Sequence, residues 1–251
     1  MAAHRSQRPC RNADIVLQTG FQSSQALRTA IAEEIPYIIA ECPAYRHLDG
    51  IGNDSHINWG YGGLMGGAWH PEPEKKQLWT PELKPTRTGD KTLIICQKSN
   101  DHSLRGHNHD EWIEKKLLEY PEATVRPHPI MWAVELPDID WSEWDRVITY
   151  SSTAGAEALI EGCQSDPEHW GSPAYKVTDR KAWIRALSYQ NFTKEMMASS
   201  FVGKHIMSGF EEARERAEQG LQETPRDKRD MKGWCYSPKI EERINASSIT
   251  E

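Results

Sequence analysis

The sequence lacks three features that would each point to a particular class of protein: a long apolar run, closely spaced cysteines and an excess of positive charge. No apolar stretch approaches the roughly 18 residues that span a bilayer. Residues 1–11 have no apolar signal core behind their basic side chains, which favours the cytosol. The five cysteines include no Cys-x-x-Cys pair, so a disulfide framework or a zinc knuckle is not expected. The net charge of -7 argues against broad electrostatic capture of nucleic acid, although it allows a local basic groove.

What the sequence does contain is enough apolar surface for a sizeable core. Of its 251 residues, 37% are hydrophobic and 27% are charged, and ten are tryptophans. This composition is typical of a globular protein rather than of a disordered or fibrous one. The length accommodates one large domain or two compact lobes of roughly a hundred residues each.

The first part of the chain has the pattern of an α/β unit. A β-rich run at Asp14–Thr19 is followed by Ser23–Glu34, whose apolar residues recur at helical spacing. Pro36 ends this helix, and the continuous apolar run Tyr37–Ala40 predicts a strand buried on both faces. The stretch Gly50–Gly67 is rich in glycine and is expected to form loop and linker.

The same alternation of strand and helix starts again at Lys91. Further strands are expected at Thr92–Cys96, Ala123–Arg126 and Trp144–Tyr150. Further helices are expected at Asp110–Glu119, Thr153–Glu161, Ala182–Tyr189 and Met196–Gln219. The economical interpretation is two α/β lobes with parallel sheets. The expected divisions are 1–85 for a short N-terminal lobe, 86–203 for the second lobe and 204–251 for a C-terminal helix and tail.

The most informative segment is Val147–Gly162, in which a buried strand leads through three hydroxyl residues into a helix. The first turn of such a helix carries unpaired N–H groups and the positive end of a dipole, and it can bind phosphate. Ser151, Ser152 and Thr153 add hydroxyl donors, and Glu157, one turn further on, can accept hydrogen bonds from ribose hydroxyls. An equally simple interpretation is a serine N-cap followed by a glutamate that favours the helix.

A second cluster, Arg126-Pro127-His128-Pro129, follows directly on an expected strand. The guanidinium can donate two parallel hydrogen bonds to a phosphate, and the imidazole can donate another. Because the carboxyl ends of parallel strands meet at one edge of a sheet, this cluster and the Ser-Ser-Thr turn are expected to converge. The alternative is a solvated arginine and a histidine in a turn.

The order of these elements resembles the nucleotide-binding lobe of GT-B glycosyltransferases. The resemblance rests on the Gln97 turn, Arg-Pro-His-Pro and Ser-Ser-Thr-x-Gly-x-Glu-Ala-Leu-x-x-Gly, and it covers about residues 14 to 200. The pattern is most similar to the capsule-polysaccharide and Kdo-transferase-like group, which also occurs in bacteriophage genomes. The resemblance implies an α/β, GT-B-like fold with two Rossmann-like lobes. Since only thirteen residues precede Asp14, the N-terminal lobe is expected to be shortened.

The resemblance also implies roles for individual side chains. The donor nucleotide sugar is expected to contact Gln97, Ser103, Arg126, His128, Ser151, Ser152, Thr153 and Glu157. The arginine, the histidine and the helix N-terminus stabilise the leaving phosphate in this scheme, so no metal cofactor is expected. Glu41, at the end of its strand, is the first candidate for the base that takes the acceptor's proton, with Asp14, Asp49 and Asp54 as further options. The alternative for Glu41 is an ordinary carboxylate at a strand end.

Two other features have a functional and a structural interpretation. Trp59 and Tyr61, among the glycines, form an aromatic wall against the acceptor or complete the core. His107, His109 and Asp110 have the residue types of a metal site, but two histidines without a further established ligand are more often surface residues. Asp110 is expected to cap the helix that follows.

The sequence therefore predicts a glycosyltransferase that moves a sugar from a nucleotide sugar to a hydroxyl group. Similarity to the phage proteins implies hydroxymethylated pyrimidine in DNA as the acceptor and the host cytoplasm as the location. A capsule or surface polysaccharide is the alternative acceptor, and the net charge of -7 counts against DNA. Two other classes stay open: a non-catalytic nucleotide-binding module and a sugar-nucleotide epimerase. No membrane partner is expected, and the sequence does not indicate an oligomeric state.

Overall fold

The computed structural model describes residues 12–20, 24–41, 56–63, 80–98, 101–104, 107–129, 138–188, 192–193, 206–207, 209–224 and 236–246. The chain divides into two compact units. Unit 1 comprises residues 1–80 and 181–230, and unit 2 comprises residues 81–180 and 231–251. This division differs from the ranges 1–85, 86–203 and 204–251, because helix α7 (Phe210–Glu218) packs within unit 1 and helix α8 (Pro238–Ala246) packs within unit 2.

Unit 1 contains a mixed four-stranded sheet in the order β1-β2-β3-β8. Its strands are β1 (Val16–Thr19), β2 (Tyr37–Glu41), β3 (His56–Tyr61) and β8 (Phe192–Thr193). Strands β1 and β2 are parallel, whereas β3 is antiparallel to both β2 and β8. The prediction of a purely parallel sheet is therefore wrong for this unit, and the predicted loop at 50–67 contains β3. The apolar residues of β3 alternate with its other residues. This alternation favours a strand more strongly than the neighbouring glycines favour a loop.

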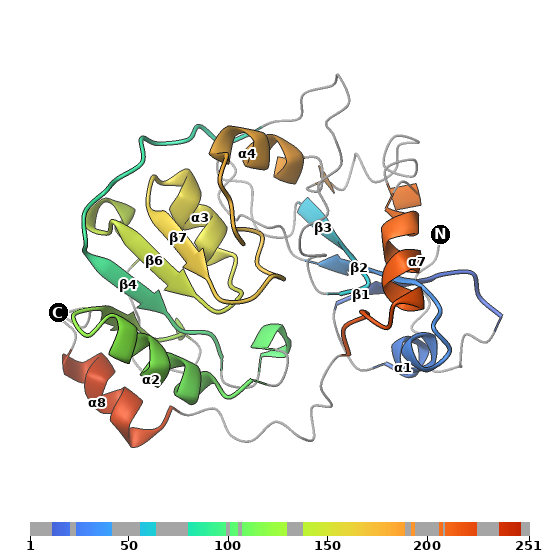
Figure 1. Cartoon of the computed structure of the whole chain (residues 1–251), viewed down its shortest axis with the longest axis horizontal. Helices are drawn as coiled ribbons and strands as arrows, with labels where there is room; N and C mark the ends of the chain where they lie inside the picture. Colours follow the sequence, from blue (N-terminus) through green and yellow to red (C-terminus); the bar gives the residue numbers. More distant parts are fainter. Residues whose placement is uncertain are drawn as a thin grey trace. The chain divides into compact units, whose positions relative to one another are not determined.

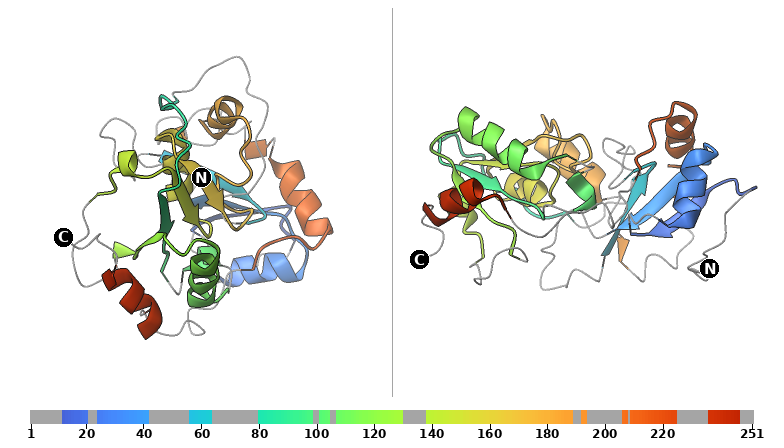
Figure 2. Two further views of the ribbon diagram at one scale, coloured as in Figure 1. Left: turned by 60° about the vertical axis from the view of Figure 1, so that its left-hand side comes forward. Right: turned by 90° about the horizontal axis from the view of Figure 1, so that it is seen from below.

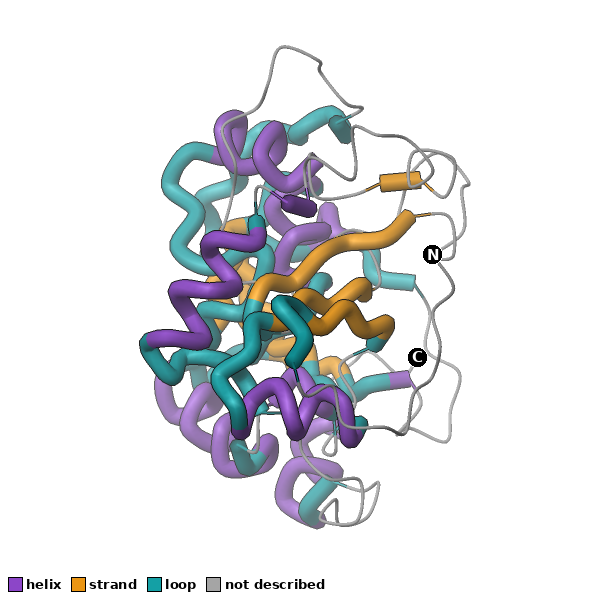
Figure 3. The backbone as a smooth tube through the Cα atoms, turned by 90° about the vertical axis from the view of Figure 1, so that its right-hand side faces the viewer, coloured by secondary structure: helices purple, strands orange, loops and turns teal. Residues whose placement is uncertain are grey.

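Helices α1 (Gln25–Ala32) and α7 cover the same face of this sheet (Figures 1 and 3). Leu27 and Ala30 of α1 are buried against Tyr37 and its neighbours on that face. Tyr37 also donates a hydrogen bond of 2.6 Å to the carbonyl of Glu223, just after α7. The serine before α1, Ser24, caps the helix by accepting the N–H of Leu27 at 3.0 Å.

Unit 2 contains a four-stranded sheet in the order β5-β4-β6-β7, with every pair parallel. Its strands are β4 (Thr92–Ile95), β5 (Thr124–Arg126), β6 (Arg146–Thr149) and β7 (Gln164–Pro167). The helices between them are η3 (His102–Leu104) and α2 (His109–Glu119) after β4, η5 (Trp141–Glu143) after β5, and α3 (Ala154–Ile160) after β6. The predicted strands β4, β5 and β6 are confirmed, and so is the α/β class of the protein.

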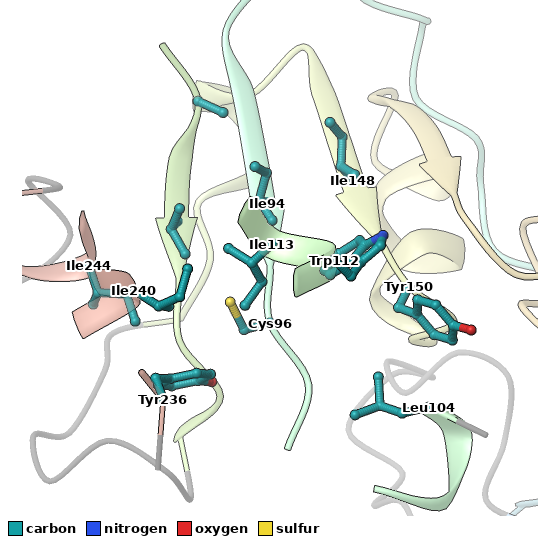
Figure 4. Close-up of a cluster of buried hydrophobic side chains, with 12 residues drawn as sticks. Ile94, Cys96, Leu104, Trp112, Ile113, Ile148, Tyr150, Tyr236, Ile240 and Ile244 are labelled. Carbon is teal, nitrogen blue, oxygen red and sulfur yellow. The ribbon is translucent and has the colours of Figure 1, made fainter. Parts of the chain in front are cut away.

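The sheet of unit 2 is buried on both faces because its residues alternate between two apolar clusters. Ile94 and Cys96 point into a cluster with α2 and α8 (Figure 4). Leu93 and Ile95 point into another cluster that includes Ala158 of α3. Figures 1 and 2 show α2 and α8 side by side. This layered arrangement leaves the carboxyl edge of the sheet to the loops that follow the strands.

Helix α4 (Arg180–Ser188) begins at the boundary between the two units. Its first residue, Arg180, donates to the carbonyls of Lys84 and Leu159 and to the Thr86 hydroxyl, all within unit 2. None of the described helices combines the length and the apolar character needed to cross a membrane.

Candidate functional site

The carboxyl edge of the parallel sheet in unit 2 brings together the predicted phosphate-binding segments. Gln97 follows β4, Arg126 ends β5, and Ser151 follows β6. From β4 the chain crosses to β5, which lies on one side of β4, and it then crosses to β6, which lies on the other side of β4. The loops after β4 and β6 therefore diverge at a topological switch point, which is where open α/β sheets bind ligands.

Gln97 ties the loops at this switch point together. Its Oε1 accepts the N–H of Ser151 at 2.9 Å, and its Nε2 donates to the hydroxyls of Ser103 and Ser151. The Ser151 hydroxyl in turn donates to the Ser103 carbonyl at 2.8 Å. Gln97 and Ser151 are only 6% and 4% exposed. The structure thus brings Gln97, Ser103 and Ser151 together, and their hydrogen bonds fix the loops. Direct contact of these residues with a nucleotide sugar stays a prediction.

Ser152 and Thr153 stand at the beginning of α3. The Ser152 hydroxyl oxygen accepts the N–H of Ala154 at 3.2 Å, so its own proton remains available as a donor. Thr153 occupies the N-cap position, but its side chain makes no capping hydrogen bond. The serine that helps to cap the helix is therefore Ser152, and the Thr153 hydroxyl is not used for capping.

Gly155 has a packing role at the start of α3. A Cβ at this position would lie 3.0 Å from the Ser165 hydroxyl and 3.3 Å from the Thr149 hydroxyl. The glycine therefore lets α3 lie close to β6 and β7. Glu157, further along α3, is half-buried, and its N–H donates to the Thr153 carbonyl at 3.2 Å. Its role with ribose stays a prediction.

Arg126 lies on the same face of the sheet as α3. Ile95 of β4 pairs with Arg126 on one side and with Thr149 on the other, so the three side chains point to one face. The Thr149 hydroxyl would lie 3.3 Å from a Cβ at Gly155 of α3. Two strand spacings, about 10 Å, separate Arg126 from Thr149 across the sheet. Arg126 is 9% exposed, and burial lowers its pKa while Asp138 opposes that shift.

His128 is held by a residue from the far end of the chain. Its backbone N–H donates to the Tyr236 hydroxyl at 2.8 Å. Tyr236 is buried in the apolar cluster that includes Ile240 and Ile244 of α8, and this burial raises its pKa. Sequence reasoning did not find Tyr236, because nothing in the local pattern links it to a turn more than a hundred residues earlier.

His109 lies at this edge too, and the expectation that it is a surface residue is wrong. His107 is exposed, as predicted, but His109 is the first residue of α2 and is only 2% exposed. Its Nε2 accepts the backbone N–H of Gln97 at 2.8 Å, and burial lowers its pKa to about 4. Asn108 caps the helix, whereas the predicted cap, Asp110, accepts the N–H of Ser237 at 2.7 Å. The described residues contain no group of three or more His, Cys, Asp or Glu placed to hold a metal ion.

The loop after β7 also contributes to this edge. Glu168 forms an ion pair of 2.8 Å with Lys116 of α2, and the ring of His169 stacks on Tyr150 at a centroid distance of 5.6 Å. Glu168 and His169 were not predicted, because no apolar pattern marks β7 in the sequence. Their position after a fourth parallel strand was the available signal.

Glu41, Trp59 and Tyr61 lie in unit 1. Glu41 ends β2, pairs with Asn58 and is half-buried. Trp59 is 6% exposed and Tyr61 is fully buried, with its ring directly beside Gly209. Both rings therefore pack in the interior, and their contact with an acceptor stays a prediction. Of the alternative bases, Asp14 is exposed, and positions 49 and 54 lie outside the described residues.

Comparison with known proteins gives a distant structural similarity and no sequence match. No protein-family model matches the chain, and no curated protein sequence matches it. Among solved structures, the chain is similar to KpsC of Thermosulfurimonas dismutans, a β-Kdo 2,4 transferase, with a TM-score of 0.42 and 16% sequence identity. The similarity covers 79% of this chain and 88% of that chain.

Proposed function

We propose that the protein is a GT-B-type glycosyltransferase that moves a sugar from a nucleotide sugar to a hydroxyl group. The nucleotide phosphate binds at the carboxyl edge of the sheet in unit 2. The observation that carries this proposal is the strand order β5-β4-β6-β7, which gathers the polar strand ends at a switch point. The residues on which the resemblance to glycosyltransferases rests follow three neighbouring strands of this sheet.

In this proposal the protein stabilises the negative charge that grows on the leaving phosphate. The Arg126 guanidinium supplies a fixed positive charge on the α3 side of the edge. The hydroxyls of Ser152 and Thr153 donate to phosphate oxygens. His128 supplies a further donor, and Gln97 keeps the loops in place so that the donors need no reorganisation. The transfer needs no metal ion.

The remaining chemistry is the removal of a proton from the acceptor. The acceptor oxygen forms a bond to the anomeric carbon while the bond from that carbon to the phosphate oxygen breaks. The bond electrons leave with the nucleotide, and the hydroxyl proton passes to the Glu41 carboxylate. The acceptor proposed first is a hydroxymethylated pyrimidine in DNA, and an oligosaccharide is the second acceptor to test.

The experiment is a transfer assay with radiolabelled nucleotide sugars. Hydroxymethylated DNA and oligosaccharides are supplied as acceptors in separate reactions, with and without a chelator. We expect labelled acceptor that forms equally well with the chelator. Glu41→Gln should reduce the rate by about a hundredfold or more, which is the usual contribution of a general base. Glu34→Gln makes the same change at an exposed glutamate of the same unit that is not a candidate base, so it serves as the matched control and should leave the rate unchanged.

The other outcomes separate the rival functions. Conversion of the donor in the absence of any acceptor indicates an epimerase. Nucleotide binding without turnover under every condition indicates a non-catalytic binding module. Either result contradicts the transferase proposal.

A further inference from the structure

His109 is buried at a position where a side chain that only filled space would need no ring nitrogen. His109 is 2% exposed and stacks on Trp112 at a centroid distance of 5.3 Å. A phenylalanine or leucine would fill the same space without the free-energy cost of burying a polar ring. Within the described part of the chain, the Nδ1 of His109 has no hydrogen-bond partner. The bond made by its Nε2 is therefore the feature that distinguishes histidine from an apolar residue here.

That bond satisfies the first N–H group beyond the hydrogen-bond ladder between β4 and β5. The ladder between β4 and β5 continues to Cys96, whose N–H donates to the Arg126 carbonyl at 2.9 Å. The next N–H, that of Gln97, donates to His109 Nε2 at 2.8 Å. A buried N–H without an acceptor is costly, so the imidazole fixes the peptide at which β4 ends. Asn108 caps α2 and thereby fixes the backbone from which the imidazole extends.

We propose that His109 is the positioning residue of the candidate site, acting through Gln97 on Ser151 and the start of α3. The chain of contacts runs from His109 Nε2 to the Gln97 backbone, and from the Gln97 side chain to the Ser151 N–H. Because Nε2 accepts a hydrogen bond, the neutral ring carries its proton on Nδ1. Loss of the acceptor frees the Gln97 peptide and loosens the loop that presents Ser152 and Thr153. The consequence for ligand binding rests on the proposed function, whereas the bond itself does not.

The test compares two substitutions that separate packing from hydrogen bonding. His109→Phe keeps an aromatic ring on Trp112 but removes the acceptor, and His109→Gln keeps an acceptor oxygen at similar reach. His107→Phe makes the same change at an exposed histidine two residues earlier. Calorimetry with uridine, cytidine, guanosine and adenosine diphosphates measures affinity, and hydrogen exchange measures protection of the Gln97 amide.

We expect His109→Phe to weaken the affinity for the preferred nucleotide by about tenfold, which corresponds to about 1.4 kcal/mol. It should also accelerate exchange of the Gln97 amide by a similar factor. His109→Gln should restore most of both properties, and His107→Phe should change neither. Equal effects of His109→Phe and His109→Gln, or no effect of His109→Phe, overturn the proposal.

A measurement on the unsubstituted protein covers the case in which His109→Phe does not fold. Nitrogen-15 spectra should show Nε2 of His109 as unprotonated and Nδ1 as protonated at neutral pH. A proton on Nε2 overturns the proposal, because that nitrogen then cannot accept the Gln97 N–H. If the unsubstituted protein binds none of the nucleotides, the proposed function fails, while the tautomer and the Gln97 exchange rate still test the role of His109.

Discussion

Single residues with many donors hold the irregular parts of unit 2 in place, and Arg87 is the clearest example. Its guanidinium donates to the carbonyls of Trp141, Trp144 and Glu161 and to the Cys163 sulfur. These acceptors lie around η5 and after α3, so one side chain joins the segment before β4 to two later loops. Lys84, three residues earlier, makes an ion pair with Glu161, but the lysine side chain is 60% exposed.

We predict that Arg87→Met destabilises the protein by about 2–4 kcal/mol, because several partly buried carbonyls lose their donor. Arg87→Lys should recover little, since an ammonium group cannot reproduce the planar fork. Lys84→Met is the matched control and should change stability by less than about 1 kcal/mol, as expected for an exposed ion pair. Urea denaturation measures all three. Similar values for Arg87→Met and Lys84→Met would show that the arginine does not hold these loops.

The candidate residues that the sequence places correctly at the carboxyl edge are those that end a predicted strand or directly follow one. Arg126 and Ser151 could be predicted because strand periodicity and the common edge of a parallel sheet place them without any further information. His109 and Tyr236 could not be predicted, because their roles depend on contacts with Gln97 and His128 that no local pattern encodes. The role of Gly155 could not be predicted either, because it depends on the contact of α3 with Thr149 and Ser165 of the sheet.

At the scale of elements, α2 is tied to the loop after β7 by a partly buried ion pair. Lys116 is 8% exposed and contacts Glu168 at 2.8 Å and Glu119 at 2.9 Å. Burial tends to lower the pKa of Lys116, but its hydrogen bonds to the two carboxylates outweigh that effect and raise it. The hydrogen bond from Lys116 lowers the pKa of Glu168, although burial opposes this shift.

This ion pair predicts a defined pH dependence of stability. Because the folded pKa of Glu168 lies below its ordinary value of 4.5, the ion pair stabilises the fold above pH 4.5. The stabilisation is lost as the pH falls through the lowered folded pKa. Glu168→Gln should therefore reduce stability by about 1 kcal/mol at neutral pH and by progressively less in acid. Denaturation curves over this pH range measure the difference.

Glu143→Gln is the control for this prediction. Glu143 pairs with Lys91 at 3.7 Å, and both side chains are more than half exposed. Its substitution should have little effect at any pH. A Glu168→Gln deficit that stays constant down to strongly acidic pH would contradict the assignment, because it could not come from the ionised carboxylate.

The elements that the sequence predicted well are those with a clear apolar period, such as β2, β4 and β6. Strand β7 has the sequence Gln-Ser-Asp-Pro, in which only Pro167 is buried, so no apolar pattern marks it. Pairing with β6 defines this strand. Strand β3 was missed for the opposite reason, because its glycine-rich surroundings concealed an alternation that the sheet uses. In both cases tertiary pairing decides between strand and loop.

At the scale of the whole molecule, the chain crosses between its two units three times, so neither unit is a continuous piece of sequence. Helix α7 completes unit 1 and α8 completes unit 2, although both come late in the chain. Composition and periodicity predict two α/β units, but they do not predict that the chain re-enters each unit late in the sequence. That depends on the apolar face against which each helix packs.

The proposed function requires a nucleotide phosphate to bind at the carboxyl edge of the sheet in unit 2. Arg126 ends β5 at this edge, whereas Arg146 begins β6 at the opposite edge of the same sheet. The most direct test is the nucleoside diphosphate affinity of Arg126→Ala and of Arg146→Ala, measured by calorimetry on folded proteins. The account predicts a loss of about tenfold or more for Arg126→Ala, as for a charged hydrogen bond, and little change for Arg146→Ala. Equal affinities for the two variants, or no binding by the unsubstituted protein, would contradict it.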